Sequence, residues 1–229
     1  MTRSDSRYET LQVFSDGPVG WLVLDRPEAA NAIDARMFVE LEAAWAELEA
    51  DAGVSCIVNT GNGRAFQTGL DVRQLARDSD ALRASSRQTR DFTLRMTGWH
   101  CGVTKPVIAA VNGTCAGGGL HFVADADLVI ASDTASFLDP HVSVGQVSAF
   151  ETIGLLKKAP AEAVFRMAFM GANERMTAGR AHQLGIVSEV VPAADLRERA
   201  QELGATISRH DRSHLVAMKA QLWNALEAP

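Results

Sequence analysis

One stretch, Lys105 to His121 (KPVIAAVNGTCAGGGLH), constrains this chain more than any other part of its sequence. It begins with a short apolar run, Val107 to Val111, which is typical of a buried strand. Asn112-Gly113 then breaks the strand, and Gly117 to Gly119 lead into apolar residues that can open a buried helix. A helix N-terminus leaves backbone N–H groups unpaired, and bare glycines let a ligand oxygen approach them closely. The stretch therefore predicts an anion or oxyanion site, with His121 in the first helical turn behind it.

The same glycines do not fit the two common phosphate-binding loops. Gly113 and Gly118 have the spacing of a P-loop, but Gly119 stands where the lysine belongs. The Gly-x-Gly-x-x-Gly spacing of a dinucleotide-binding turn is absent as well. A turn that only packs a helix against a strand is the remaining alternative, and it becomes the weaker one once the other motifs are considered.

Length and composition restrict the class of protein. A chain of 229 residues suits one large domain that buries about 70–75% of its unfolded surface. Its hydrophobic content of 47% is ordinary for a globular protein, and its net charge of −6 offers no basic surface for nucleic acid. No apolar run approaches the ~18 residues of a membrane span, and the polar start shows no signal-peptide pattern. We therefore expect a cytoplasmic protein with no nucleic-acid or membrane partner.

The three cysteines, Cys56, Cys101 and Cys115, have no metal-ligand spacing, and their odd number argues against a disulfide framework. We expect buried thiols in a reducing compartment, and no metal site.

Apolar patterns along the chain alternate between strand-like and helix-like periods. Strands are predicted at residues 20–25, 55–60, 107–111, 126–132, 136–140 and 186–191. Helices are predicted over residues 37–48, 79–97 and 177–184, and in two further segments from residue 194 onward. This alternation predicts an α/β fold without a linker or a repeat of fixed period.

Four separated motifs indicate one family. They are RPEAANA (26–32), FQTGLD (66–71), KPVIAAVNGTCAGGG (105–119) and MTAGRAHQLGIVSEVVP (176–192). In their order and spacing the chain resembles the crotonase superfamily, the enoyl-CoA hydratase/isomerase family, over nearly its whole length. The resemblance implies a crotonase (ClpP-like) spiral of ββα units over residues 1–192, which carries the active site. It also implies a short helical C-terminal region, residues 193–229, that builds homotrimers or hexamers.

The resemblance further implies an acyl-CoA thioester as ligand, with no cofactor beyond coenzyme A itself. In the family two backbone N–H groups hold the thioester oxygen, and matching motif to motif places them at Thr68 and Gly118. Such donors are worth ~2.7–4 kcal/mol each. The family usually has alanine where Thr68 stands, but a backbone donor survives that change. Contacts to the ligand are implied for Ala29, Ala30, Ala65, Phe66, Thr68, Leu70, Asp71, Arg73, Gly117 and Gly118. For Arg73, a solvated helix face is an equal alternative.

The chain departs from the family at the catalytic acids. Hydratases of the family resemble one another in having a glutamate three residues after the oxyanion glycine and a second in a Gln-Pro-Glu segment. Here His121 and His141 stand at these positions. Two histidines with pKa values near ~6.5 can divide the acid and base roles. Near a helix N-terminus, His121 is expected to be neutral. The alternative is that both are structural, in a site that binds acyl-CoA with little chemistry.

Glu151 is a third candidate acid, because some isomerases and C–C hydrolases of the family take a carboxylate from this later loop. Ser148-x-x-Glu151 also fits a capping box that opens the next helix. His100, between Trp99 and Cys101, is interpreted as a surface or packing residue.

We therefore expect an enoyl-CoA hydratase/isomerase-like enzyme, a lyase or isomerase, that stabilises an enolate and uses a His121/His141 acid–base pair. One alternative is a hydrolase of a thioester or of a β-dicarbonyl C–C bond, resembling 6-oxocamphor hydrolase. Another is a non-catalytic acyl-CoA binding protein. Family members generally continue for a few helical turns beyond the point where this chain ends at Pro229, so we expect closure of the acyl pocket and the phosphate contacts to differ here.

Overall fold

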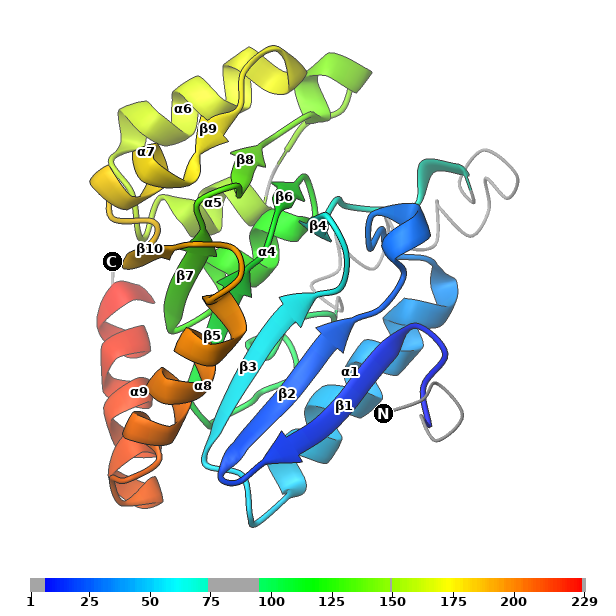
Figure 1. Ribbon diagram of the computed structural model, residues 1–229. Coiled ribbons are helices and arrows are strands. Elements are labelled where there is room, and N and C mark those ends of the chain that lie inside the picture. The colour runs from blue at the N-terminus through cyan, green and yellow to red at the C-terminus, as the bar shows by residue number, and fades with distance from the viewer. Residues whose placement is uncertain (1–6, 74–94, 149, 228–229) are drawn as a thin grey trace.

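The computed structural model describes residues 7–73, 95–148 and 150–227. Its main sheet has six strands in the order β1-β2-β3-β5-β7-β10 (Figure 1). The strands are β1 (Leu11–Asp16), β2 (Val19–Leu24), β3 (Cys56–Gly61), β5 (Val107–Val111), β7 (Leu128–Ser132) and β10 (Glu189–Val191). β1 and β2 form an antiparallel hairpin, and every other neighbouring pair is parallel.

A second, smaller sheet follows the order β4-β6-β8-β9. Its strands are β4 (Ala65–Gln67), β6 (Thr114–Ala116), β8 (Ser136–Leu138) and β9 (Met176–Thr177). Each turn of the chain adds one strand to the main sheet and then one to the small sheet, first β3 and β4, then β5 and β6, then β7 and β8. The chain therefore advances as a spiral, and the predicted α/β fold is confirmed.

The main sheet is covered on both faces, which explains why its central strands are apolar throughout. All residues of β2, β3 and β5 are buried. One face packs against α1 (Ala35–Ala50), whose Leu41 and Trp45 belong to the larger apolar core. The other face packs against α8 (Leu196–Ile207) through Leu196 and Ala200.

The remaining helices are α4 (Gly119–Ala124), α5 (Phe150–Leu155), α6 (Ala161–Met170), α7 (Ala178–Gln183) and α9 (Arg212–Glu227). Thr177 caps α7 as predicted, since its hydroxyl accepts the Arg180 N–H at 3.2 Å. No helix among the described residues is both long and apolar enough to span a membrane. The predicted helix over residues 79–97 lies mostly outside the described residues.

The C-terminal helices differ in how they attach. α8 is part of the sheet packing, whereas α9 makes polar contacts, which include the Lys105 carbonyl, accepting from Lys219 at 2.8 Å, and the Asp127 carboxylate. The Lys219 ammonium lies 2.9 Å from Asp127, and the Trp223 indole N–H donates to the same side chain at 2.6 Å. The predicted domain boundary at residue 192, and an assembly role for the region beyond it, stay predictions.

Four strands have no counterpart in the sequence prediction. β4, β6 and β9 are only two or three residues long, too short to show a period of two. β1 is six residues long, but its burial does not alternate, because one end is buried and the other is exposed.

Candidate active site

Two turns at the carboxyl ends of neighbouring strands form one side of the site. β4 and β6 are parallel, with Ala65 paired to Thr114, so both strands end at the same edge of the small sheet. Thr68 and Gly69 follow β4, and Gly117 and Gly118 follow β6. A Cβ placed on Gly69 would lie 3.3 Å from the Gly118 nitrogen, so the two turns are in backbone contact.

Glycine is required where α4 begins. A Cβ on Gly119 would lie 2.4 Å from the Gln67 carbonyl oxygen, a distance that no side chain can occupy. Gly117 has a φ of +52°, in the left-handed region that favours glycine. The predicted tight turn therefore has a packing role as well, because its glycines allow α4 to pack directly against β4.

The amides of Thr68 and Gly118 differ from those of their neighbours. The Gly117 N–H donates to the Leu138 carbonyl at 3.2 Å, and the Gly69 N–H donates to the Gln67 side-chain oxygen at 2.8 Å. Among the turn, loop and cap hydrogen bonds of the described residues, none has the Thr68 or Gly118 N–H as its donor. The Thr68 hydroxyl donates to the Ala30 carbonyl at 3.0 Å, so this side chain is held by the neighbouring loop. Two backbone donors are thus free to meet an oxygen.

Behind these turns, three titratable side chains converge from separate segments. His121 lies on α4, His141 begins the short 3-10 helix η3 (His141–Val144), and Glu151 lies in the first turn of α5. The Glu151 carboxylate sits between the two imidazoles, 3.6 Å from His121 Nε2 and 3.4 Å from His141 Nε2. A Cβ on Gly117 would lie 3.6 Å from His141 Cε1, so this group adjoins the glycine turn.

A fourth residue, Asp139, forms a hydrogen bond with the other ring nitrogen of His141. Its Oδ1 lies 2.5 Å from His141 Nδ1 and also accepts the His141 backbone N–H at 3.1 Å. The hydrogen bond to Asp139 raises the pKa of His141 despite the opposing effect of burial, and the nearby Glu151 charge adds to the rise. Burial alone would raise the pKa of Asp139, but the hydrogen bond from His141 helps to bring it below its usual value. The four side chains are in contact one after another, in the order Asp139, His141, Glu151, His121.

His121 differs in its electrostatics. Its side chain is buried, and burial lowers its pKa, although Glu151 acts in the opposite direction. The sequence predicts a neutral His121 because the residue lies near the start of a helix. In the structure, burial is the largest cause of its lowered pKa. The capping box gains no support, because the Glu151 carboxylate faces the imidazoles and the Ser148 hydroxyl contacts the Thr152 hydroxyl at 3.0 Å.

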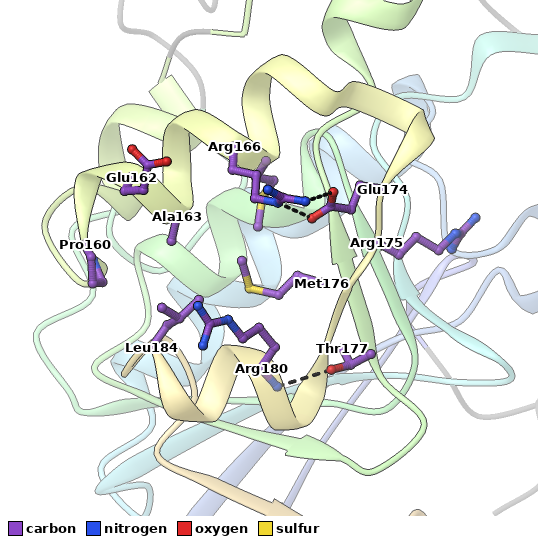
Figure 2. Close-up of a pocket in the computed structure, with 11 residues that line it drawn as sticks. Pro160, Glu162, Ala163, Arg166, Glu174, Arg175, Met176, Thr177, Arg180 and Leu184 are labelled. Atoms are coloured by element: carbon purple, nitrogen blue, oxygen red, sulfur yellow. Dashed lines mark hydrogen bonds and ion pairs between the residues drawn. The ribbon is translucent and has the colours of Figure 1, made fainter.

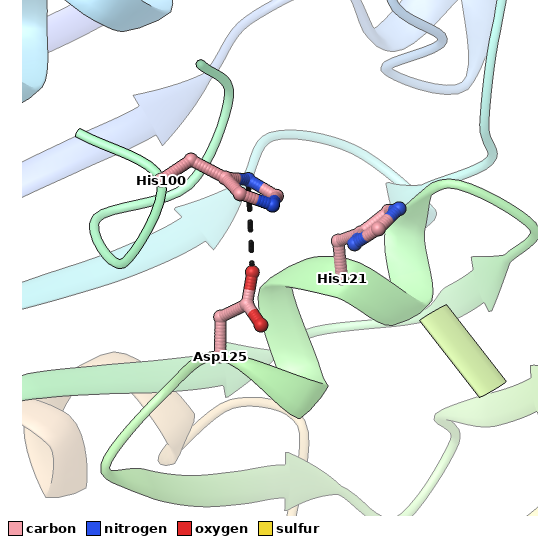
Figure 3. A group of neighbouring side chains, drawn as sticks. All are labelled: His100, His121 and Asp125. Carbon is pink, nitrogen blue, oxygen red and sulfur yellow. Dashed lines mark ion pairs between the residues drawn. The ribbon is translucent and has the colours of Figure 1, made fainter. Parts of the chain in front are cut away.

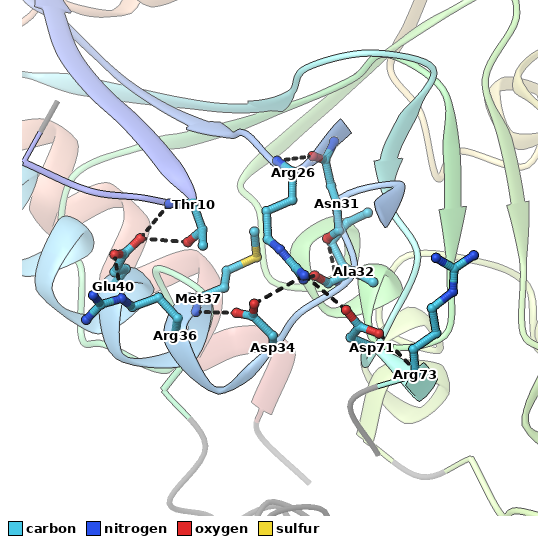
Figure 4. A network of polar contacts seen from close by, with 11 residues as sticks. Thr10, Arg26, Asn31, Ala32, Asp34, Arg36, Met37, Glu40, Asp71 and Arg73 are labelled. Atoms are coloured by element: carbon cyan, nitrogen blue, oxygen red, sulfur yellow. Dashed lines mark hydrogen bonds and ion pairs between the residues drawn. The ribbon is translucent and has the colours of Figure 1, made fainter. Parts of the chain in front are cut away.

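The loop expected to contact coenzyme A is braced by Arg26 (Figure 4). Its guanidinium lies 3.0 Å from Asp71 and 3.2 Å from Asp34. The Asp71 carboxylate is therefore engaged within the protein and ties the RPEAANA segment to the FQTGLD turn. Ile33 and Leu70 add a parallel bridge between the same two segments.

The other predicted ligand contacts fall into two groups. Ala65 and Phe66 are buried, whereas Ala30 is half-buried with a left-handed φ of +51°. Arg73 is exposed and points away from the Arg26 network in Figure 4. Ala29 belongs to a short 3-10 helix beside Ala30.

Two cavities lie near these elements, and the larger one is not at this site. A cavity of 620 Å³ between α6 and α7 is bordered by Arg166, Arg175 and Arg180 (Figure 2). It contains none of the predicted site residues, and Arg166 is already paired with Glu174 at 2.6 Å. A cavity of 270 Å³ has His121 in its wall, together with Trp99, His100, Ala124, Asp125, Phe150, Ile153, Gly154, Lys157 and Trp223.

Sequence reasoning missed Asp139 as a partner of His141, and it missed the contacts of His100. The Asp-Pro-His order at 139–141 was the available signal for the first. His100 is half-buried, with its ring 5.3 Å from that of His121, centroid to centroid. No local sequence pattern predicts the contact between these two rings.

Comparison with known proteins shows the family and the fold of the chain. The family model of the enoyl-CoA hydratase/isomerases matches residues 16–229. The chain is 34% identical over 221 residues to a probable enoyl-CoA hydratase of Mycobacterium bovis, covering 96% of this chain and 84% of the relative. It is 32% identical over 208 residues to 2,3-dehydroadipyl-CoA hydratase of Escherichia coli, covering 90% and 78%.

Solved structures show the same relationship. The crystal structure of an enoyl-CoA hydratase/isomerase from Mycobacterium paratuberculosis matches with a TM-score of 0.85 at 36% identity, covering 97% of this chain and 84% of that one. An enoyl-CoA hydratase subunit from Geobacillus kaustophilus matches with a TM-score of 0.86 at 31% identity, covering 98% and 85%. The chain therefore belongs to the enoyl-CoA hydratase/isomerase family of enzymes and has the crotonase fold.

Proposed function

We propose that this enzyme acts on an acyl-CoA thioester, stabilising an enolate or oxyanion with the Thr68 and Gly118 amides and moving protons with His121, His141 and Glu151. The observation that carries the proposal is the Glu151 carboxylate between two imidazoles, next to a turn with two free backbone donors. The relatives named as enoyl-CoA hydratase and 2,3-dehydroadipyl-CoA hydratase support an acyl-CoA as the substrate.

The chemistry divides between the two sides of the site. The amide donors hold the thioester oxygen as negative charge develops, which costs no reorganisation because the backbone is already fixed. On the other side, Glu151 accepts a proton from water or from a substrate carbon, and His141 Nε2 shares that proton. The raised pKa of His141 makes it the group of the three best suited to return a proton near neutral pH. His121, kept neutral by burial, lies beside Glu151, with its Nε2 3.6 Å from the carboxylate.

A hydrolase is a second candidate, and one observation favours it. Asp139 holds His141 Nδ1 at 2.5 Å, and a histidine oriented by a buried carboxylate is a common way to activate water for attack on a carbonyl. Product analysis separates the two candidates. Hydrolysis of the thioester releases free coenzyme A, and hydrolysis of a C–C bond yields a ring-opened or shortened acid. Hydration keeps the thioester and adds only water.

We extend the proposal to a homotrimer or a dimer of trimers. Phe165 and Phe169 on α6 stack at 6.0 Å, and 49% and 77% of their surfaces are exposed in the single chain. Exposed aromatic pairs of this kind favour burial between subunits. Sedimentation of the purified protein tests the assembly directly, and a monomer at all concentrations would contradict it.

The test of the proposed function begins with a set of acyl-CoAs screened by thermal shift, followed by turnover assays on those that stabilise the protein. We expect crotonyl-CoA to be a poor substrate, because histidines occupy the two usual glutamate positions. On a good substrate, His141→Ala should lower kcat by ~10²–10⁴-fold with ligand affinity nearly unchanged. The exposed His182→Ala is the matched control. Stabilisation by acyl-CoA without any turnover would favour a binding protein over an enzyme.

A further inference from the structure

A second cluster of ligand-type side chains lies on the far side of His121 from His141. His121 and Asp125 are four residues apart, and the Asp125 N–H donates to the His121 carbonyl at 2.9 Å, one turn of α4. Side chains at this spacing share one face of a helix. His100 comes toward them from the loop that precedes β5, with its Nδ1 3.7 Å from Asp125 Oδ2 (Figure 3). One ligand atom from each of the three residues lies within 4.8 Å of the others.

From this arrangement we propose that His100, His121 and Asp125 bind a divalent transition-metal ion of the Zn²⁺ class. Two imidazoles and one carboxylate are the donor set of many zinc and iron sites. Bonds of ~2.0–2.2 Å in a tetrahedral site separate the ligand atoms by about 3.4 Å. The His100–Asp125 pair is already close to this value. The third ligand atom lies within 4.8 Å of the other two, so side-chain rotation has to bring it closer.

The residues around the cluster orient its ligands as metal sites require. A metal-binding histidine usually directs its other ring nitrogen at a carboxylate or carbonyl, and ligating carboxylates accept hydrogen bonds of their own. His121 Nε2 faces Glu151 at 3.6 Å, which leaves the lone pair of Nδ1 for a metal. The Thr97 hydroxyl donates to Asp125 Oδ2 at 2.7 Å. Because that proton goes to Asp125, the same hydroxyl oxygen accepts from His100 Nδ1–H at 2.9 Å. A metal bound to Nδ1 replaces this contact and leaves the ring proton on Nε2.

The protonation states of His100, His121 and Asp125 also bear on metal binding. Burial lowers the pKa of His100 to about 4 and also lowers that of His121, so both imidazoles are neutral at neutral pH. Burial raises the pKa of Asp125, because its negative charge is poorly solvated there. The nearby Lys158 and Lys157 charges act in the opposite direction, and a divalent cation bound to this carboxylate acts in the same direction as the lysines.

The cluster opens into the 270 Å³ cavity, which has all three residues in its wall. Three protein ligands with a further position open to water or a small ligand are typical of reactive rather than purely structural zinc sites. The ion would also bind the face of His121 opposite Glu151, so its occupancy is expected to alter the acid–base group. The site itself rests on geometry alone and does not depend on the proposed acyl-CoA activity.

The test is a titration of the full chain, freed of metal by chelation, with Zn²⁺ followed by calorimetry and with Co²⁺ followed by visible absorption. We expect one saturable site, with an affinity that His100→Asn and Asp125→Asn each weaken by at least about 10-fold. The exposed His210→Ala should bind as the unchanged chain does. His100→Asn retains a polar group toward Thr97 and should fold even if Asp125→Asn does not, and circular dichroism checks both.

Two results would overturn the proposal. One is the absence of saturable binding by the unchanged chain. The other is equal affinity in the unchanged chain, the folded His100→Asn variant and the His210→Ala control, since the ion would then bind elsewhere.

Discussion

The two sides of the active site are built in opposite ways. The Thr68/Gly118 side consists of backbone amides, fixed by the pairing of β4 with β6 and by the close contact of Gly69 with Gly118. The acid–base side consists of side chains from three segments, α4, η3 and α5, that meet only at Glu151. A backbone site tolerates a change of side chain, whereas a side-chain site changes its chemistry with every substitution.

The largest effect is expected when the charge of Glu151, between the two imidazoles, is removed. Glu151→Gln keeps the size and packing of the side chain between His121 and His141 but cannot exchange a proton. We expect kcat to fall by ~10²–10⁴-fold, the share of a positioned acid or base, with acyl-CoA affinity little changed. Glu162→Gln, on the exposed side of α6, is the control. Activity close to that of the unchanged enzyme would remove Glu151 from the mechanism.

The backbone side is tested by deleting one donor. Gly118 has a φ of −53°, which proline can adopt, so Gly118→Pro removes the N–H with limited backbone strain. We expect kcat to fall by about 10²–10³-fold, as for one oxyanion donor. Gly118→Ala keeps the N–H, and its Cβ would lie 3.4 Å from the Gly69 Cα, an ordinary contact. If alanine were as damaging as proline, crowding rather than the lost donor would be the cause.

A smaller effect is expected at Asp139, whose role is to position His141. His141 must be neutral to share the proton that Glu151 accepts, so turnover should rise with pH through an apparent pKa above its ordinary ~6.5, because Asp139 stabilises the protonated imidazole. Asp139→Asn removes that stabilisation. The rise of turnover with pH should then occur at lower pH, with a modest loss of kcat. A pH–rate profile measures the shift. A limb that stays in place, or a flat profile between about pH 5 and 9, would contradict the assignment.

The smallest effect should come from Thr68, since only its backbone is expected to act. Thr68→Ala removes the hydroxyl that donates to the Ala30 carbonyl and should cost about 0.5–1.5 kcal/mol of unfolding free energy. Turnover should be nearly unchanged, because the N–H remains. Thr68→Ser retains the hydroxyl and serves as the control in chemical denaturation. A large loss of kcat in Thr68→Ala alone would mean that the side chain, and not only the amide, meets the substrate.

The sequence by itself determined the local structure and the family. The apolar run at 107–111 predicts β5 at its observed bounds, and Thr177 caps α7 as expected. These features depend on neighbours in the chain, through side-chain periodicity, caps and the backbone freedom of glycine, so local patterns are sufficient to find them. The four motifs extend the same information to the fold, because their order along the chain is retained.

The tertiary structure alone decided which side chains meet. Glu151 lies ten residues beyond His141 and thirty beyond His121, and nothing in that spacing places its carboxylate between their rings. The same holds for His100, brought to Asp125 by the strand order of the main sheet. Burial then set the charges, lowering the pKa of His121 and of His100 and letting Asp139 raise that of His141. Desolvation and distance act through space, so they depend on how distant segments pack, which no local pattern records.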